Sequence, residues 1–146
     1  MQRNSVRALC VLGGATAVAT ALAFPQIAAA SPSPSISATP STGLTDGTVV
    51  TATVNGFTAG GTVQVSECAI PSAGLIVCDK SQVARITTDA TGSASTTVTA
   101  RKSFTGYTLD GTQWGPVDCP TVPGGCLIGA VDQPVTVHVG VPISFQ

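Results

Sequence analysis

Short segments in which apolar residues alternate with small polar ones place the strongest constraint on the fold of this chain. Clear examples are Val50 to Val54, Thr62 to Ser66 and Val135 to Val139. Successive side chains of a β-strand point to opposite faces, so alternation with a period of two predicts half-buried strands. Helix-favouring residues are scarce, since residues 31–146 contain one Glu and no Met, whereas Thr, Val, Ser and Gly are abundant. The sequence therefore predicts an all-β fold.

Turn-forming residues separate these segments at regular intervals. They are Asp46-Gly47, Asn55-Gly56, Gly60-Gly61, Asp89 to Gly92, Asp110-Gly111 and Gly124-Gly125. Such residues favour the tight turns of antiparallel hairpins. The strands predicted between them cover residues 35–39, 48–54, 62–68, 83–88, 93–100, 126–131 and 135–145, the last interrupted by Pro142. This spacing predicts a seven-stranded antiparallel immunoglobulin-like β-sandwich.

Residues 1–30 have the pattern of a secretory signal peptide. Arg3 and Arg7 precede an uncharged apolar stretch that stops at Pro25, and Ala28-Ala29-Ala30 supplies an A-x-A cleavage site. Glycines interrupt the stretch, so it falls short of the roughly 20 apolar residues that a membrane-spanning helix needs. We therefore expect a secreted, extracellular protein with a single domain at residues 31–146.

The charge of that domain disfavours anionic partners. Four Lys or Arg residues and seven Asp or Glu residues remain after residue 30, which gives a formal charge of −3. Arg101 and Lys102 are adjacent cations, but two charges bind DNA only weakly. We expect no direct binding to membranes and no strong direct binding to DNA.

Four cysteines lie in the predicted domain: Cys68, Cys78, Cys119 and Cys126. An even number of cysteines in an exported chain predicts two disulfides, for which three pairings are possible. We favour the pairs Cys68 with Cys78 and Cys119 with Cys126, because each closes a short loop that contains Gly and Pro. A zinc site is the alternative, although export favours oxidation and C-x-x-C spacing is absent.

Several ordered motifs between about Ser35 and the end of the chain resemble one known family. They are Thr39 to Val50 (TPSTGLTDGTVV), Cys68-Ala69, Asp89 to Thr96 (DATGSAST), Arg101 to Phe104 (RKSF), Asp110 to Gly115 (DGTQWG), Val117 to Cys119 (VDC) and Ile143 to Phe145 (ISF). The sequence resembles the neocarzinostatin family of antibiotic apoproteins. The resemblance implies a seven-stranded sandwich with a cleft at one end and the same two disulfides. It also implies that the cleft holds a non-covalently bound enediyne chromophore, which is shielded until its release to cut DNA. We expect a monomer that uses no metal or other cofactor.

The resemblance also implies which residues line the cleft. They are Cys68, Ile70, Ile76, Cys78, Val83, Leu109, Gly111, Leu127 and Val131. The best-known member of the family has aromatic rings at the positions of Ile70, Val83 and Leu109, and polar side chains at those of Leu127 and Val131. Aliphatic side chains fill less volume than aromatic ones and do not stack on flat ligands. We therefore expect a wider, more aliphatic cleft whose ligand is a different enediyne, a related polyketide, or nothing.

Three further residues have competing interpretations. His138 is interpreted as an exposed strand residue, because no G-x-S-x-G or similar context supports a hydrolase. Trp114 is interpreted as packing at the end of the sandwich rather than stacking on a ligand. Glu67 is expected to be a solvated carboxylate at a strand end rather than a group facing the cleft. The predicted core residues are Val50, Ala52, Val54, Val63, Val65 and Val98.

The favoured function is therefore a binding module that sequesters a hydrophobic small molecule without catalysis. The alternative is a secreted structural or protein-interaction sandwich that has lost its cargo. The substituted cleft positions motivate this alternative.

Overall fold

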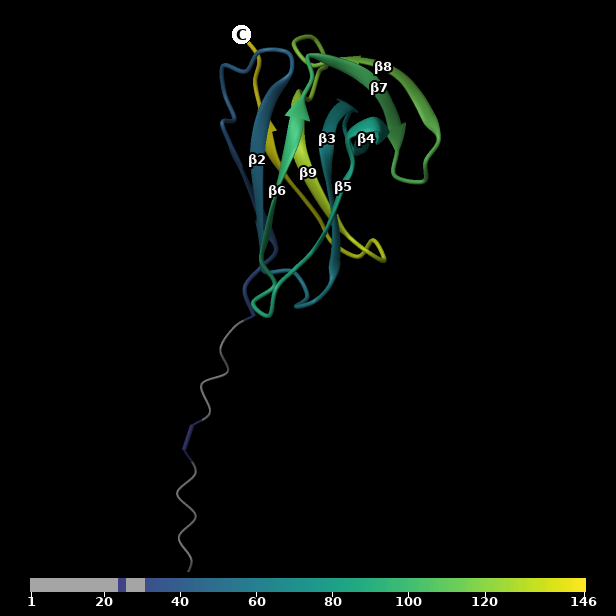
Figure 1. Ribbon diagram of the computed structural model, residues 1–146. Helices are drawn as coiled ribbons and strands as arrows, with labels where there is room; N and C mark the ends of the chain where they lie inside the picture. The colour runs from purple at the N-terminus through teal and green to yellow at the C-terminus, as the bar shows by residue number, and fades with distance from the viewer. Residues whose placement is uncertain (1–23, 26–30) are drawn as a thin grey trace, which may run out of the picture.

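The computed structural model describes residues 24–25 and 31–146 (Figure 1). The predicted signal peptide lies outside the described residues except for Phe24 and Pro25, so it stays a prediction. The domain consists of two antiparallel sheets, as expected for an all-β sandwich. No helix in the described residues is long and apolar enough to cross a membrane.

The smaller sheet has three strands. They are β1 (Ser35–Thr39), β2 (Thr48–Asn55) and β6 (Ala94–Ala100), with β2 in the middle. Both neighbours pair antiparallel to β2, with Ala38 opposite Ala52 on one side and Val50 opposite Val98 on the other. The sheet buries alternate residues of β2 because successive side chains point to opposite faces.

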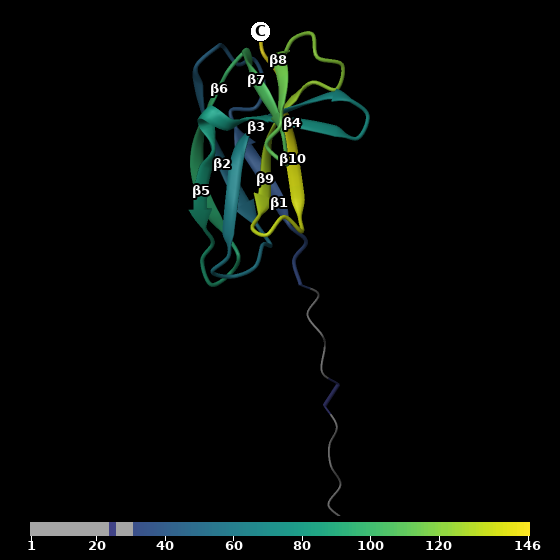
Figure 2. The same cartoon turned by 90° about the vertical axis from the view of Figure 1, so that its right-hand side faces the viewer.

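The larger sheet has seven strands in the order β10, β9, β3, β4, β7, β8, with β5 also paired to β3. The bounds are β3 (Thr62–Ser72), β4 (Leu75–Asp79), β5 (Ala84–Thr87), β7 (Ser103–Thr108), β8 (Gln113–Asp118), β9 (Cys126–Asp132) and β10 (His138–Ile143). A short 3-10 turn, η1 (Lys80–Gln82), connects β4 to β5. The ribbon of β7 and β8 extends away from the body of the sandwich (Figure 1), and the β3–β4 hairpin projects from it in the turned view (Figure 2).

The core lies between the two sheets. All six predicted core residues are buried, with exposed fractions of 3% or less. Ile128 and Ala130 of β9 and Leu44, which precedes β2, complete the centre of this cluster. The core residues of β3 and β9 occupy alternate positions, so the other face of each strand points away from the core.

Residues 31–146 contain ten strands, three more than the seven that the sequence predicts there. The additional strands are β4, β7 and β8. Strand β4 is a continuous apolar run without alternation, and β7 contains Gly106, so neither matches the expected pattern. Strand β8 contains Gly115 and Pro116, which argue against a strand. The structure accommodates Pro116 because β8 is an edge strand of the sheet.

The last predicted strand is shorter than expected. Strand β10 begins at His138, and residues 133–137 form a bend instead. The Asp132 carboxylate accepts hydrogen bonds from the backbone N–H groups of Thr136 and Val137, each at 2.7 Å. These N–H groups are therefore not available to a strand partner at this point.

Candidate ligand-binding cleft

A cleft of about 640 Å³ opens on the face of the larger sheet that points away from the core. On β3, Val63 and Val65 are buried in the core, while Gln64, Ser66 and Cys68 line the cleft. The alternation of side chains along the strand therefore assigns one set of residues to each face. The cleft is formed by the strand face that the core does not use.

The floor consists of cross-strand rows set by the register of β3, β9 and β10. In the middle row, Ser66 lies opposite Gly129, which lies opposite Gly140. This row carries the smallest side chains of the floor. A Cβ atom at Gly140 would lie 2.6 Å from Cδ1 of Leu127, so the leucine side chain occupies the space beside the glycine.

The next row carries the first disulfide. Cys68 lies directly opposite Cys78 on β4 and opposite Leu127 on β9. The disulfide Cys68–Cys78 joins the paired positions with a Cα–Cα distance of 3.9 Å, and both cysteines line the cleft. Tyr107 of β7 lies opposite Cys78 and continues the row toward the projecting ribbon.

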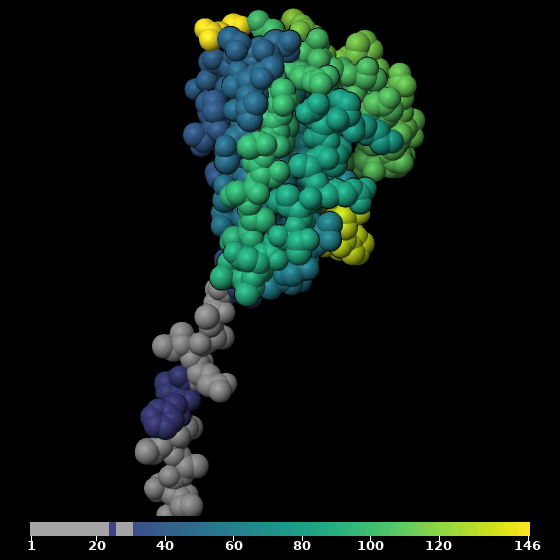
Figure 3. Space-filling model, viewed as in Figure 1, coloured from purple at the N-terminus to yellow at the C-terminus, as the bar shows by residue number. Residues whose placement is uncertain are grey.

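One wall of the cleft comes from the β7–β8 ribbon, which stands out from the body of the molecule in the space-filling view (Figure 3). Its turn presents Leu109 and Gly111 to the cleft, and Gly111 adopts a φ of +90°, which favours glycine. Asp110 holds this turn by accepting hydrogen bonds from the Thr108 hydroxyl and the Thr112 N–H, and these bonds lower its pKa. The ammonium of Lys80 lies 4.9 Å from the centre of the Tyr107 ring and donates a hydrogen bond of 3.3 Å to the Gly111 carbonyl.

All residues predicted to line the cleft do line it. They are Cys68, Ile70, Ile76, Cys78, Val83, Leu109, Gly111, Leu127 and Val131. Their contact with a ligand remains a prediction. Several polar residues that were not predicted also line the cleft, namely Gln64, Ser66, Lys80, Arg85, Tyr107 and His138. Alternation back along β3 from Cys68 was the signal that could have identified Gln64 and Ser66.

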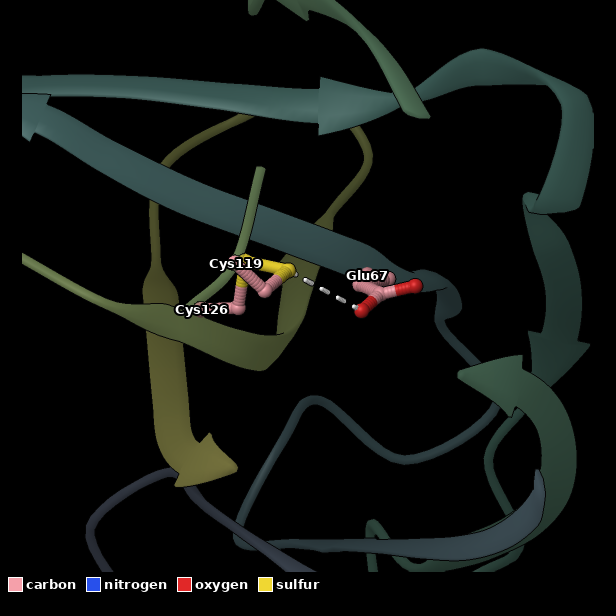
Figure 4. A group of neighbouring side chains, drawn as sticks. All are labelled: Glu67, Cys119 and Cys126. Atoms are coloured by element: carbon pink, nitrogen blue, oxygen red, sulfur yellow. Dashed lines mark hydrogen bonds between the residues drawn. A yellow bond between two sulfur atoms is a disulfide. The ribbon is translucent and has the colours of Figure 1, made fainter. Parts of the chain in front are cut away.

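The second disulfide, Cys119–Cys126, does not line the cleft and lies beside Glu67 (Figure 4). Both pairings agree with those expected from the sequence and exclude the zinc interpretation, because the disulfides occupy all four thiols. Glu67 lies next to Cys119 and Cys126, but two joined sulfurs supply no thiolate for a metal. This group is therefore a structural cluster of the core.

The expectation that Glu67 is solvated is wrong. Its side chain is fully buried on the core face of β3, in alternation with Val63 and Val65. Oε2 accepts a 2.7 Å hydrogen bond from the Arg101 N–H, and Oε1 lies 3.6 Å from the Cys119 sulfur. Burial raises the pKa of Glu67 to about 7, against the lowering effect of the Arg101 hydrogen bond.

The structure also changes the interpretation of Trp114 and extends that of His138. Trp114 on β8 does not line the cleft, so it does not stack on a ligand there, and the residue is 45% exposed and only partly packed. Its place on an edge strand that extends from the body explains this exposure. His138 is exposed, as expected, but it also lines the cleft.

The described fold and cleft define a class: an all-β sandwich with a preformed, largely aliphatic cleft bordered by a disulfide. The sequence pattern of the Neocarzinostatin family matches residues 36–145. The chain therefore belongs to the neocarzinostatin family.

Individual relatives agree with this assignment. The chain is 41% identical over 118 residues to the antitumor antibiotic C-1027 apoprotein of Streptomyces globisporus, which covers 80% of each chain. It resembles the solved structure of macromomycin with a TM-score of 0.71 and 32% identity, covering 78% of this chain and all (100%) of the other. The solution conformation of apokedarcidin matches with a TM-score of 0.62 and 35% identity, covering 79% of this chain and 100% of that protein.

Proposed function

We propose that this protein is a secreted carrier that binds and protects a small hydrophobic antibiotic chromophore of the enediyne type, without a covalent bond. On release, the chromophore damages DNA, and the protein itself contacts DNA only through this cargo. The observation that carries the proposal is the preformed cleft of about 640 Å³, which is the size of pockets that hold drug-sized ligands. The resemblance to antibiotic apoproteins supplies the chemical class of the ligand.

The chemistry of the cleft supports protection of a reactive ligand. Aliphatic side chains such as Ile76, Val83 and Leu127 exclude water from the surface that they cover. All cysteines of residues 31–146 are joined in disulfides, so none of them offers a thiol to attack the cargo. The proposal includes no catalytic step and no metal.

Native mass spectrometry of the protein purified from its producing organism tests the proposal. We expect one organic adduct per chain, which solvent extraction removes, and a polypeptide mass that begins at Ser31. Repeated isolation of the protein without any adduct contradicts the carrier function. A polypeptide that retains residues 1–30 contradicts the secretory processing.

Two variants show whether the adduct occupies the cleft. Ser66→Trp places a large ring on the middle row of the floor, and we expect it to abolish the adduct. Thr97→Trp places the same ring at an exposed position of β6, in the other sheet, and serves as the matched control. Equal adduct yields from both variants would contradict binding in the cleft.

A structural or protein-interaction domain is the second candidate. Leu109 is 50% exposed and Trp114 is 45% exposed, and both belong to the projecting β7–β8 ribbon. A contiguous patch of exposed apolar side chains marks a contact surface, and these two residues are the candidates for such a patch on the ribbon. This candidate predicts that the protein is isolated without an adduct and that no enediyne polyketide synthase is encoded beside its gene.

A further inference from the structure

The cleft has a charge opposite to that of the domain. Its lining includes the cations Lys80 and Arg85 together with His138, and it contains no carboxylate. Residues 31–146 carry only four Lys or Arg residues against seven Asp or Glu residues. Half of the basic side chains of an acidic domain therefore lie at this one site.

The basic groups surround the apolar floor. One cross-strand row runs from Arg85 on β5 through Gln64 on β3 and Val131 on β9 to His138 on β10. Arg85 and His138 stand at the two ends of this row, with the Gln64 amide between them. Lys80 lies at the wall formed by the β7–β8 turn, where it contacts the Tyr107 ring and the Gly111 carbonyl. An ammonium has three donors, so the bond to Gly111 leaves others for a ligand.

Four carboxylates adjoin lining residues in the sequence, Glu67, Asp79, Asp110 and Asp132, and none of them lines the cleft. Glu67 and Asp79 are buried, and Asp79 accepts hydrogen bonds from the Ser81 N–H and hydroxyl. Asp110 and Asp132 each accept hydrogen bonds from a threonine hydroxyl and from backbone N–H groups of their own turns. Lys80 and Arg85 are exposed to solvent, so they set a positive sign of the potential at the cleft that salt screens in part.

We propose that the cleft selects an apolar molecule that carries an anionic group, such as a carboxylate, a sulfonate or an ionised phenol, and disfavours a cationic one. The apolar body covers the aliphatic floor, and the anionic group faces Arg85 and Lys80. This inference rests on the proposed carrier function, because it assigns the chemical class of the ligand for the same cleft. Charge complementarity supplies specificity in addition to the affinity of apolar burial.

Two fluorescent probes with the same aromatic body test the proposal on the protein of residues 31–146. Anilinonaphthalene sulfonate carries the anionic group, and N-phenylnaphthylamine lacks it. We expect the sulfonate probe to bind on the order of tenfold more tightly. Perturbed amide signals of Ser66, Gly129 and Gly140 in NMR spectra locate both probes at the floor.

The double variant Lys80→Gln with Arg85→Gln removes the two permanent charges. We expect it to abolish the preference for the sulfonate probe while the affinity for the uncharged probe changes by less than about twofold. The double variant Arg101→Gln with Lys102→Gln, outside the cleft, removes the same amount of charge, and we expect it to keep the preference. A preference that survives in the double variant, or equal binding of both probes to the wild type, overturns the anion selectivity and leaves the carrier function standing. If neither probe perturbs the floor, both proposals are overturned.

Discussion

Glu67 is the one glutamate of the chain, and it is buried between a disulfide and a backbone N–H group. Its folded-state pKa of about 7 lies above the ordinary value of 4.5, because burial disfavours the charged form. The folded protein therefore binds more protons than the unfolded chain between these two values. The stabilising contribution is complete below about pH 4.5 and is lost as the pH rises to about 7.

This linkage predicts that the free energy of unfolding falls by up to about 3 kcal/mol between about pH 4.5 and about pH 7.5. Glu67→Gln keeps an oxygen that accepts from the Arg101 N–H but does not ionise, so we expect it to flatten the pH dependence in this range. Urea unfolding at several pH values measures both profiles. Parallel profiles for the variant and the wild type would show that Glu67 does not cause the loss.

The exposed carboxylates change the pH dependence of the free energy of unfolding in the opposite direction. The pKa values of Asp89, Asp110 and Asp132 lie below the ordinary value of 3.8, and the largest cause is a hydrogen bond from a threonine side chain to each carboxylate. Their stabilising contribution is present above the ordinary pKa and is lost as the pH falls through the folded value. The fold is therefore expected to be most stable in mildly acidic solution.

At the scale of the elements, the two disulfides have different surroundings. Cys68–Cys78 joins β3 to β4 and lines the cleft, whereas Cys119–Cys126 packs beside Glu67 in the core. The bridges close loops of similar length, with sequence separations of 10 and 7. Loop length therefore gives little reason for a difference in stabilisation, while position gives a clear reason for a difference in binding.

We expect replacement of either cysteine pair by serine to lower the free energy of unfolding by roughly 2 to 5 kcal/mol. Binding of anilinonaphthalene sulfonate should fall markedly only when Cys68 and Cys78 are replaced, because this bridge forms part of the cleft. Thermal melts and probe titrations, performed below the melting range of both variants, measure the two effects. Equal losses of binding would remove the special role of the first bridge.

Strands with regular alternation of apolar and polar residues were predicted correctly from the sequence. Strand boundaries that depend on a position at the sheet edge or on a side-chain hydrogen bond were not. Val50, Ala52 and Val54 alternate with polar residues, so their burial in β2 followed directly. Strand β8 contains Pro116 and was missed, because only its position at the sheet edge makes the proline acceptable. The bend before β10 was missed because it depends on the Asp132 side chain, which takes the Thr136 and Val137 N–H groups.

In the candidate site, too, some residues could be predicted from the sequence and others could not. Its apolar lining could be predicted through the family resemblance, including Leu127 and Val131. The polar row from Arg85 to His138 depends on the register of four strands, which no short segment of the sequence specifies. Glu67 was assigned wrongly because a charged residue rarely lies in a core, although its alternation with Val63 and Val65 indicated the core face.

At the scale of the whole molecule, each of the two outermost strands of the larger sheet contains a proline. Strand β8 carries Pro116 and strand β10 carries Pro142. The open side of an outermost strand is a template on which a second copy of a chain can add its own strand, the first step toward fibres. A proline interrupts the template because it lacks the N–H group and resists regular pairing.

The prolines therefore act against self-association and favour the expected monomer. We expect Pro116→Val combined with Pro142→Val to increase concentration-dependent assembly, as measured by multi-angle light scattering, because the substitutions restore N–H donors on both outer strands. Pro123→Val in the loop before β9 is the matched control and should leave the protein dispersed. Two residues that appear as breaks in the strand pattern thus oppose aggregation at each open end of the sheet.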